Sequence, residues 1–165
     1  MLRRAANTAV TCLRKLPARH LGSAPTPPPF TLGKLHHVAL AVPDLARASA
    51  FFADVLRAEL APAHALPSHG VTASFVELPG ETPTRVELLE PLGDASPMAG
   101  FLRKKPLGGV HHLCFEVSDV RGAVEHVKGM GVRVLGAVKV GAMGKEVVFL
   151  HPEDCGGVLV ELQQE

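Results

Sequence analysis

Large and small side chains alternate along residues 35–42 and again along residues 110–117. A period of two is typical of a β-strand, in which successive side chains point to opposite faces. The face of smaller residues starts at His37 in the first stretch and at His112 in the second, and we expect it to line a cavity. The opposite face should pack in the core. It holds His36, Val38, Leu40 and Val42 in the first stretch and His111, Leu113, Phe115 and Val117 in the second.

These two strands belong to an internal repeat. His37 and His112 are 75 residues apart, and an aspartate follows each of them after seven residues. A later strand in each copy carries one glutamate, Glu87 in the first and Glu161 in the second. The repeat therefore predicts two similar modules in one domain.

An amphipathic helix is expected after each of the two strands. Asp44 and Asp119 should cap the N-termini of these helices, which run to about Arg57 and to Gly129. Their apolar stripes consist of Leu45, Ala48, Phe52, Val55 and Leu56 in the first helix and of Val120, Ala123, Val124 and Val127 in the second.

The rest of each copy predicts further strands. They lie at residues 71–78 and 85–89 in the first copy and at 132–135, 145–150 and 158–162 in the second. Residues 58–69 look irregular, with room for one short strand near residues 59–62, and a helical turn is expected around residues 98–104. We divide the chain into module one (31–92), a linker (93–106) and module two (107–165), which together form a single domain.

Two histidines and two glutamates occupy matched positions in the repeat. In the last strand Glu161 falls on the face opposite Val158, Val160 and Leu162. A single strand histidine is more often a structural residue, and a single strand glutamate usually faces solvent. Because both residue types recur in both copies, the pattern favours a metal site shared by the modules, with His37, Glu87, His112 and Glu161 as candidate ligands.

Residues 1–30 differ in charge from the rest of the chain. They hold five of the 17 basic side chains and none of the 16 acidic ones, so residues 31–165 have a net charge of −4. Apolar residues recur at helical spacing from Leu2 to Leu16, which is typical of a mitochondrial presequence. A disordered basic tail is the alternative. We expect residues 1–30 to be a presequence with a Pro-rich linker, and the mature protein to reside in the mitochondrial matrix.

Composition excludes several other classes of protein. The chain has 47% hydrophobic and 20% charged residues, the profile of one globular domain, and no apolar run reaches the length of a membrane span. Its three cysteines do not form a disulfide framework or a zinc finger. Residues 31–165 are mildly acidic, and the chain has no Trp or Tyr to stack on bases, so nucleic acid is not an expected partner.

Five segments of the chain form a recognisable set: LHHVALAVPDL at 35–45, ELLEPL at 87–92, SPMAGFL at 96–102, GGVHH at 108–112 and FLHPEDCGGVLVEL at 149–162. They resemble the vicinal oxygen chelate superfamily, which includes glyoxalases, extradiol dioxygenases and methylmalonyl-CoA epimerases. Within it, the methylmalonyl-CoA epimerase family is the most similar, over about residues 32–163. The ending with Gly156 and Gly157 is more specific than the His-His strand, which occurs across the superfamily.

This resemblance implies an α+β fold of two tandem βαβββ modules, which form a curved mixed sheet around a metal site. It implies that His37, Glu87, His112 and Glu161 hold a divalent cation with open positions, such as Co²⁺ or Mn²⁺. The activity implied is epimerisation of methylmalonyl-CoA by removal and return of the α-proton through a stabilised enolate. A homodimer is also implied.

Inversion at a carbon needs proton transfer on both faces of the enolate. Glu161 is expected to be one acid/base group. The second is open, because the position where some family members have a glutamate corresponds here to Ala73, which leaves Glu87 or Glu77. Three basic sites could bind the phosphates of coenzyme A. These are Lys139, Lys145 and the Arg103-Lys104-Lys105 cluster.

Two other functions remain in view at this point. One is another metal enzyme of the same fold, such as a glyoxalase-type lyase or a non-haem iron dioxygenase. The other is a metal-free module that only binds a ligand. Four candidate ligands and the predicted presequence favour the epimerase.

Overall fold

A computed structural model describes residues 27–81 and 84–165 of the chain. The predicted presequence and linker, residues 1–30, therefore lie outside the described residues except for the last four. The first half contains β1 (Leu32–Ala41), α1 (Leu45–Ala50), the π-helical turn η1 (Phe51–Val55), β2 (Glu59–Leu60), β3 (His64–Leu66), the 3-10 turn η2 (Pro67–His69), β4 (Val71–Glu77) and β5 (Arg85–Pro91). Then follow α2 (Pro97–Lys104), β6 (Gly109–Val117), α3 (Val120–Gly129), β7 (Val134–Val140), β8 (Glu146–Leu150), the 3-10 turn η3 (Pro152–Asp154) and β9 (Leu159–Gln164).

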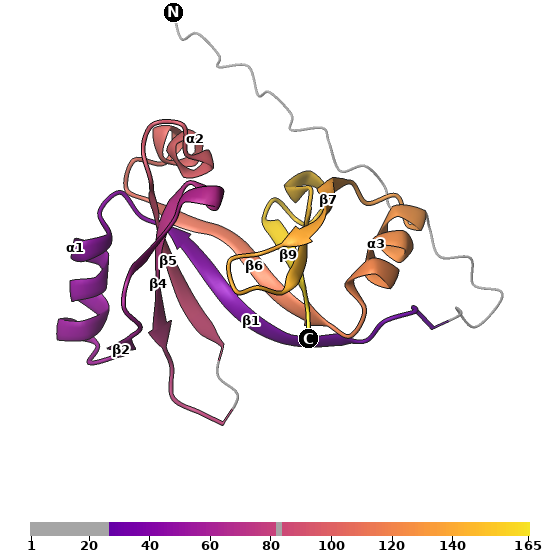
Figure 1. The fold of residues 1–165 in the computed structure, drawn as a ribbon, viewed down its shortest axis with the longest axis horizontal. Coiled ribbons are helices and arrows are strands. Elements are labelled where there is room, and N and C mark those ends of the chain that lie inside the picture. The colour runs from indigo at the N-terminus through magenta and orange to yellow at the C-terminus, as the bar shows by residue number, and fades with distance from the viewer. Residues whose placement is uncertain (1–26, 82–83) are drawn as a thin grey trace, which may run out of the picture.

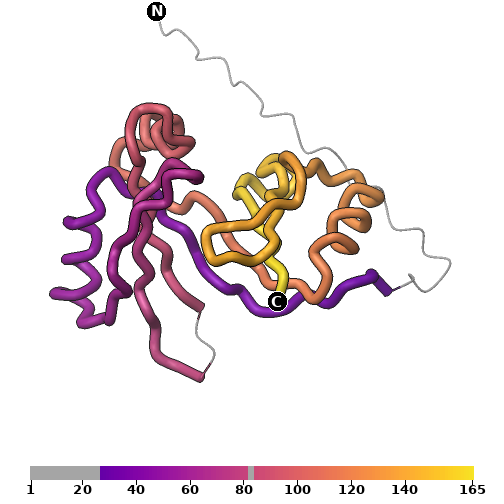
Figure 2. Tube along the Cα trace, viewed as in Figure 1, coloured from indigo at the N-terminus to yellow at the C-terminus, as the bar shows by residue number. Residues whose placement is uncertain are grey.

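One mixed sheet runs through both halves of the molecule. Its strand order is β2-β4-β5-β1-β6-β9-β8-β7, with β3 added beside β4. The pairs β1–β5 and β6–β9 are parallel, and the other pairs are antiparallel. The two halves lie side by side in Figure 1, joined by the long strands β1 and β6, and the tube in Figure 2 follows the same path. The expected α+β fold with a mixed sheet is confirmed.

The junction between β1 and β6 places the two repeat histidines together. In this antiparallel pair His37 lies opposite Cys114, and Ala39 lies opposite His112. His37 and His112 are equivalent in the repeat, and so are Ala39 and Cys114. The two cross-strand pairs are therefore equivalent to each other, and the junction has local two-fold symmetry. Both histidines consequently fall on the same face of the sheet, next to each other.

Each strand of this junction carries a β-bulge at the residue before the repeat histidine. The register steps from Leu35 to His37 against adjacent residues of β6, so His36 is the extra residue in β1. It steps in the same way around His111, the extra residue in β6. A bulge changes the direction of the side chain it carries. His111 accordingly lines the cavity described below, and its expected place on the packed face is wrong.

Helix α1 begins as predicted but ends differently. The Asp44 side chain accepts a hydrogen bond from the amide of Arg47 at 2.8 Å, which confirms the N-cap. After Ala50 the backbone widens into η1, in which the amide of Leu56 donates to the carbonyl of Phe51. The wider turn rotates the last residues around the axis. Val55 and Leu56 are therefore exposed, and their predicted place in the apolar stripe is wrong.

Helix α3 follows the prediction more closely. Asp119 accepts hydrogen bonds from the amides of Arg121 and Gly122, and Val120 and Ala123 are fully buried against β8 and β9. Among the described residues, no helix is long and apolar enough to cross a membrane.

Two strands also differ from the prediction. Strand β3 was not expected, and β7 covers Val134–Val140 rather than residues 132–135.

Gly108 makes a close contact between the two halves at the start of β6. Its backbone has φ = 83°, and a Cβ atom at this position would collide with the carbonyl oxygen of Ala41. We expect Gly108→Ala to lower the free energy of unfolding by about 1–3 kcal/mol or more, because strain and collision add. Gly129→Ala in α3 is the matched control, since a Cβ there meets no atom within 4 Å. Chemical denaturation should show a loss for the first variant and none for the second.

Candidate active site

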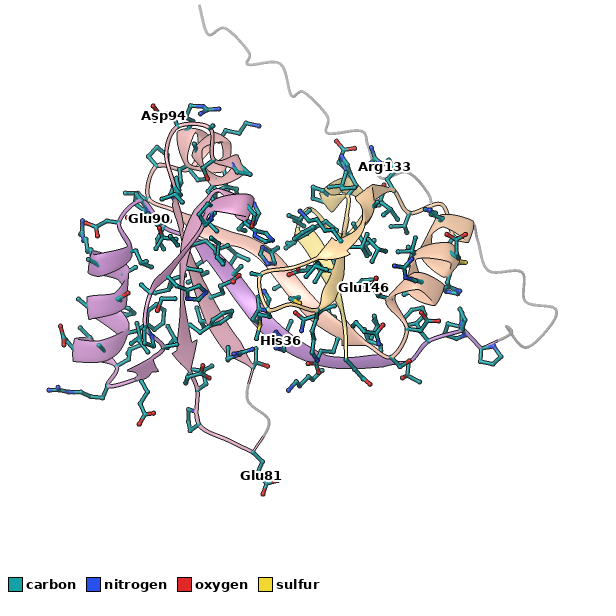
Figure 3. All side chains as sticks on the ribbon, in the orientation of Figure 1. His36, Glu81, Glu90, Asp94, Arg133 and Glu146 are labelled. Atoms are coloured by element: carbon teal, nitrogen blue, oxygen red, sulfur yellow. The ribbon has the colours of Figure 1, made fainter. Side chains whose placement is uncertain are left out.

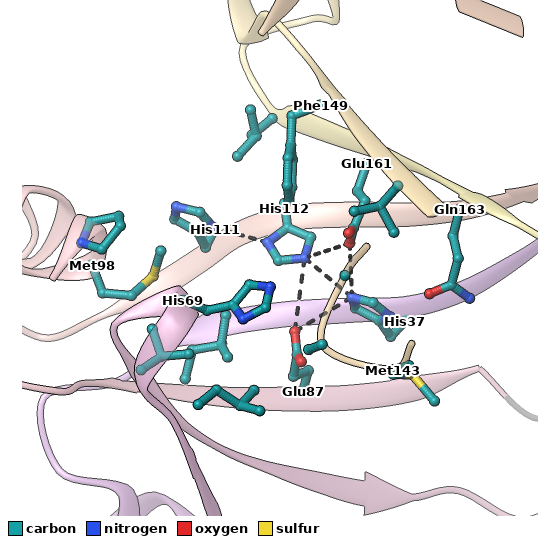
Figure 4. Close-up of a pocket in the computed structure, with 18 of the residues that line it drawn as sticks. His37, His69, Glu87, Met98, His111, His112, Met143, Phe149, Glu161 and Gln163 are labelled. Atoms are coloured by element: carbon teal, nitrogen blue, oxygen red, sulfur yellow. Dashed lines mark hydrogen bonds and ion pairs between the residues drawn. The ribbon is translucent and has the colours of Figure 1, made fainter. Parts of the chain in front are cut away.

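A cavity of about 390 Å³ opens where the two halves meet. Its walls come from β1, β3, β4, β5 and the η2 turn of the first half, from the start of α2, and from β6, β7, β8, β9 and the β7–β8 loop of the second half. Figure 4 shows the polar side chains gathered at its centre. Ligand sites often lie between two structural units, so the position of this cavity between the two halves favours a ligand site.

The four predicted site residues converge in this cavity. Nε2 of His37 lies 3.1 Å from Nε2 of His112. One carboxylate oxygen of Glu161 is 3.5 Å from the first nitrogen and 3.2 Å from the second. The corresponding distances from Glu87 are 3.4 and 3.8 Å. All four side chains are buried, with at most 7% of each residue exposed.

The parallel strand pairs explain why each glutamate meets the histidines. In the first half Ala39 of β1 lies beside Glu87 of β5, and in the second half Cys114 of β6 lies beside Glu161 of β9. Each glutamate is thus paired with the residue two positions after the repeat histidine, on the same face. The same register in both halves builds the site twice, from opposite sides.

Each repeat histidine also meets a phenylalanine edge-on. The ring centres are 5.9 Å apart for His37 and Phe75 and 5.5 Å apart for His112 and Phe149. Each phenylalanine is paired, on the adjacent antiparallel strand, with the glutamate of its own half. These contacts hold the imidazole rings in one orientation.

The two bulged histidines support the repeat histidines from behind. Nδ1 of His36 lies 2.8 Å from Nδ1 of His37, and Nδ1 of His111 lies 2.9 Å from Nδ1 of His112. Adjacent strand residues could not meet in this way without the bulges, since they would point to opposite faces. The guanidinium of Arg85 also donates to Nε2 of His36 at 2.8 Å, and Figure 3 places His36 between the two halves. These contacts restrict rotation of the His37 and His112 rings.

Burial and hydrogen bonding separate the two carboxylates electrostatically. Burial raises the pKa of Glu87 to about 7, against the attraction of His37. Burial would also raise the pKa of Glu161, but hydrogen bonds from His112 and His37 outweigh it and lower this pKa to about 2. Burial and the charge of the adjacent histidine lower the pKa values of His36 and His111 to about 4. Glu161 is therefore ionised at neutral pH, while Glu87 is poised between its two forms.

The donor set fits a divalent cation. The ligand atoms of His37, His112 and Glu161 all lie within 4.8 Å of one another and are buried. Donor atoms that share one ion at about 2.1 Å are about 3.0–3.4 Å apart, close to the distances observed here. Glu87 lies at the edge of this group, near both imidazoles. Two imidazoles and two carboxylates suit first-row transition ions better than Ca²⁺ or Mg²⁺.

Other predicted residues fall inside or outside the cavity. Lys139 lines it, whereas Lys145 and the cluster at residues 103–105 do not. Ala73 is fully buried in the core beside α2, and Glu77 is absent from the cavity wall and pairs with Arg85 at 3.8 Å.

Sequence reasoning missed the η2 turn, whose Ser68 and His69 line the cavity. This turn follows a segment with two prolines and no regular period, and the only sequence signal was the histidine beside Gly70.

The ionisation of Glu87 should govern how metal affinity depends on pH. A cation needs this carboxylate without its proton, so affinity should fall as the pH drops from about 7.5 to 5.5. The stability of the metal-free fold should depend on pH in the opposite direction. The folded chain keeps the proton up to about pH 7 and the unfolded chain only to about 4.5, so this stabilising contribution is lost as the pH rises through 7.

Glutamine at position 87 cannot release a proton. The Glu87→Gln substitution should therefore remove this residue's effect on the pH dependence of both metal affinity and the stability of the metal-free fold. Calorimetric titration of the Glu87→Gln variant with Co²⁺ should show that the slope of log affinity against pH falls by about one in this window. An unchanged slope would show that Glu87 does not release a proton when the ion binds.

Comparison with known proteins places the chain among characterised relatives. Residues 36–149 match the model of the glyoxalase/bleomycin resistance protein/dioxygenase superfamily. The human mitochondrial methylmalonyl-CoA epimerase is 53% identical over 136 residues, which cover 82% of this chain and 76% of the human protein. The ethylmalonyl-CoA/methylmalonyl-CoA epimerase of Cereibacter sphaeroides is 52% identical, over 81% of this chain and 98% of that protein. The chain belongs to the methylmalonyl-CoA epimerase family.

A solved structure of the same family shares the fold. A variant of the Streptomyces coelicolor methylmalonyl-CoA epimerase, in complex with 2-nitronate-propionyl-CoA, superposes with a TM-score of 0.75. It has 30% sequence identity and covers 82% of this chain and 96% of its own. The resemblance stated from the sequence is thus confirmed, and the glyoxalase-type lyase and the metal-free module are not supported as alternatives.

Proposed function

We propose that the protein interconverts the two epimers of methylmalonyl-CoA by a metal-dependent exchange of the α-proton. The observation that carries this proposal is the buried group of His37, His112 and Glu161 at the centre of the cavity between the halves. Membership of the methylmalonyl-CoA epimerase family supports the substrate and the type of reaction. The enzyme is therefore an epimerase.

His37, His112, Glu161 and Glu87 are the residues proposed to hold the ion, with Co²⁺ or Mn²⁺ as the most suitable ions. When bound, the ion would supply positive charge to stabilise the oxygen that becomes negative as the α-proton leaves. The Nδ1 contacts with His36 and His111 would keep the two ligand imidazoles aligned.

The chain's own residues then handle the proton and the substrate. Glu161 is ionised, so its carboxylate can accept the α-proton on one face of the substrate. Burial excludes water from the reacting carbon and strengthens these interactions. Lys139 on β7 lines the same cavity and offers a positive charge to an anionic part of the thioester substrate.

The proposed setting is a homodimer in the mitochondrial matrix. The basic residues 1–21 and the names of the human, bovine and mouse relatives, which are called mitochondrial, support this location. The homodimer is proposed from the resemblance of the sequence to the superfamily.

Isotope exchange tests the proposed activity. The purified protein, loaded with Co²⁺, is incubated with one epimer of methylmalonyl-CoA in D₂O, and the α-carbon is followed by NMR. We expect deuterium to appear there together with the opposite epimer. A metal-loaded sample that produces neither would refute the epimerase assignment.

A further inference from the structure

Inversion requires a second proton-transfer group, on the face of the substrate opposite Glu161. The expected candidates for this role do not fit. Glu77 lies outside the cavity, and Ala73, at the position where some family members have a glutamate, has no acidic group and is buried in the core. Glu87 lies 3.4 Å from Nε2 of His37, among the donor atoms with Glu161, rather than across the cavity from them.

Three other titratable side chains line the cavity in the part of the chain that the structure describes: His69, His111 and Lys139. Lys139 comes from β7 in the same half as Glu161, with its ammonium 5.9 Å from the centre of the Phe149 ring. His111 is held by its contact with Nδ1 of His112. Of the three, His69 alone comes from the first half, and it is free of the metal cluster.

The η2 turn aims His69 into the cavity. It ends at Gly70, which has φ = 66° and whose amide donates to the carbonyl of Pro67 at 3.1 Å. A Cβ on Gly70 would lie 3.2 Å from the ring of Pro97 at the start of α2, so the turn is seated on that helix. Figure 4 shows the His69 imidazole entering from the first half, while Glu161 enters from the second.

A hydrogen-bond partner defines which nitrogen of His69 faces the substrate. The hydroxyl of Ser68 lies 3.0 Å from Nδ1 of His69. Nδ1–H of His69 can donate to this hydroxyl oxygen in both the neutral and the protonated ring, so that Nε2 accepts a proton in the first state and delivers one in the second. In both states Nε2 is left for the substrate, as an acid/base group needs.

We propose that His69 is the second acid/base residue, acting on the face opposite Glu161. In one direction the Glu161 carboxylate takes the α-proton, the electron pair of the C–H bond enters the thioester carbonyl, and Nε2–H of protonated His69 delivers a proton to the opposite face of the α-carbon. The reverse direction starts from neutral His69 and protonated Glu161. Protons and electrons balance without a further reactant, and solvent restores the starting forms.

The proposal rests on the proposed function and is tested with single epimers in D₂O. In His69→Asn, inversion should fall by about 10²- to 10⁴-fold. The epimer whose α-hydrogen faces Glu161 should still exchange it for deuterium with retention of configuration, while the other epimer should not exchange. Ser68→Ala should give the same one-sided exchange in weaker form, which provides a second variant if His69→Asn folds poorly.

The matched control is His64→Asn, because His64 is exposed on β3 and lies outside the cavity wall. It should behave as the unmodified protein, with equal metal content in all samples. Undiminished inversion in His69→Asn, or an equal loss of exchange from both epimers, would overturn the role of His69. Failure of the unmodified protein to exchange either epimer would instead refute the epimerase itself, so the two failures are distinguishable.

Discussion

Glu161→Gln is expected to lower the rate of epimerisation by about 10²- to 10⁴-fold. The carboxylate is kept ionised by hydrogen bonds from His112 and His37 despite its burial, so at neutral pH it can take up a proton. Glutamine has nearly the same shape and offers an oxygen to the ion, but it cannot accept the proton. The rate of inversion and the metal content should both be measured.

Glu77→Gln is the control for this substitution. Glu77 lies on β4 outside the cavity, with 42% of its side chain exposed, so its loss should leave the rate unchanged. If Glu161→Gln retained full activity while Glu77→Gln lost it, the acid/base group would lie elsewhere than in this cavity.

His112→Ala should lower the affinity for Co²⁺ by more than about 100-fold, since loss of a residue that only supports a ligand already costs 10- to 100-fold. The substitution removes one imidazole nitrogen from the cluster, at 3.1 Å from the other. It also takes away a hydrogen-bond partner of Glu161. Calorimetric titration and the metal content after dialysis measure the effect.

His64→Ala serves as the control, because it removes an exposed imidazole that lies outside the cavity wall. Circular dichroism establishes that both variants are folded. A folded His112→Ala protein with normal metal content and activity would mean that the ion, if it is required, binds at another place.

The arrangement of the four candidate ligands could be read from the sequence because it depends on period and repetition. Strand parity put His37 and His112 on faces lined by small residues, and the β1–β6 junction brings these faces together. The same reasoning separated Glu161 from Val160 and Leu162, which pack in or against the core. The repeat supported the same interpretation, because a site to which both modules contribute equivalent residues leaves the same pattern of His and Glu in each copy.

The bulges at His36 and His111 could not be predicted in this way. A bulge is a mismatch between two paired strands, and the alternation within one strand carries no information about it. For that reason His111 was assigned to the wrong face. The π-helical turn after Ala50 likewise moves Val55 and Leu56 away from the expected stripe, since regular helical spacing assumes one turn type throughout.

His69 escaped prediction for another reason. Its turn lies between the short strand β3 and the interior strand β4, and its position depends on how Gly70 and Pro97 pack in three dimensions. Such contacts join residues far apart in the sequence. The second acid/base group therefore became a definite residue only once the cavity wall was known.

Metal removal and restoration tests the central claim most directly. The protein is treated with a chelator, dialysed, and titrated with Co²⁺ while the conversion of one methylmalonyl-CoA epimer into the other is followed. A metal-dependent epimerase at this site should be inactive after chelation and should regain activity in proportion to added ion, up to one ion per chain. Full activity in protein that holds no ion would contradict the proposed function.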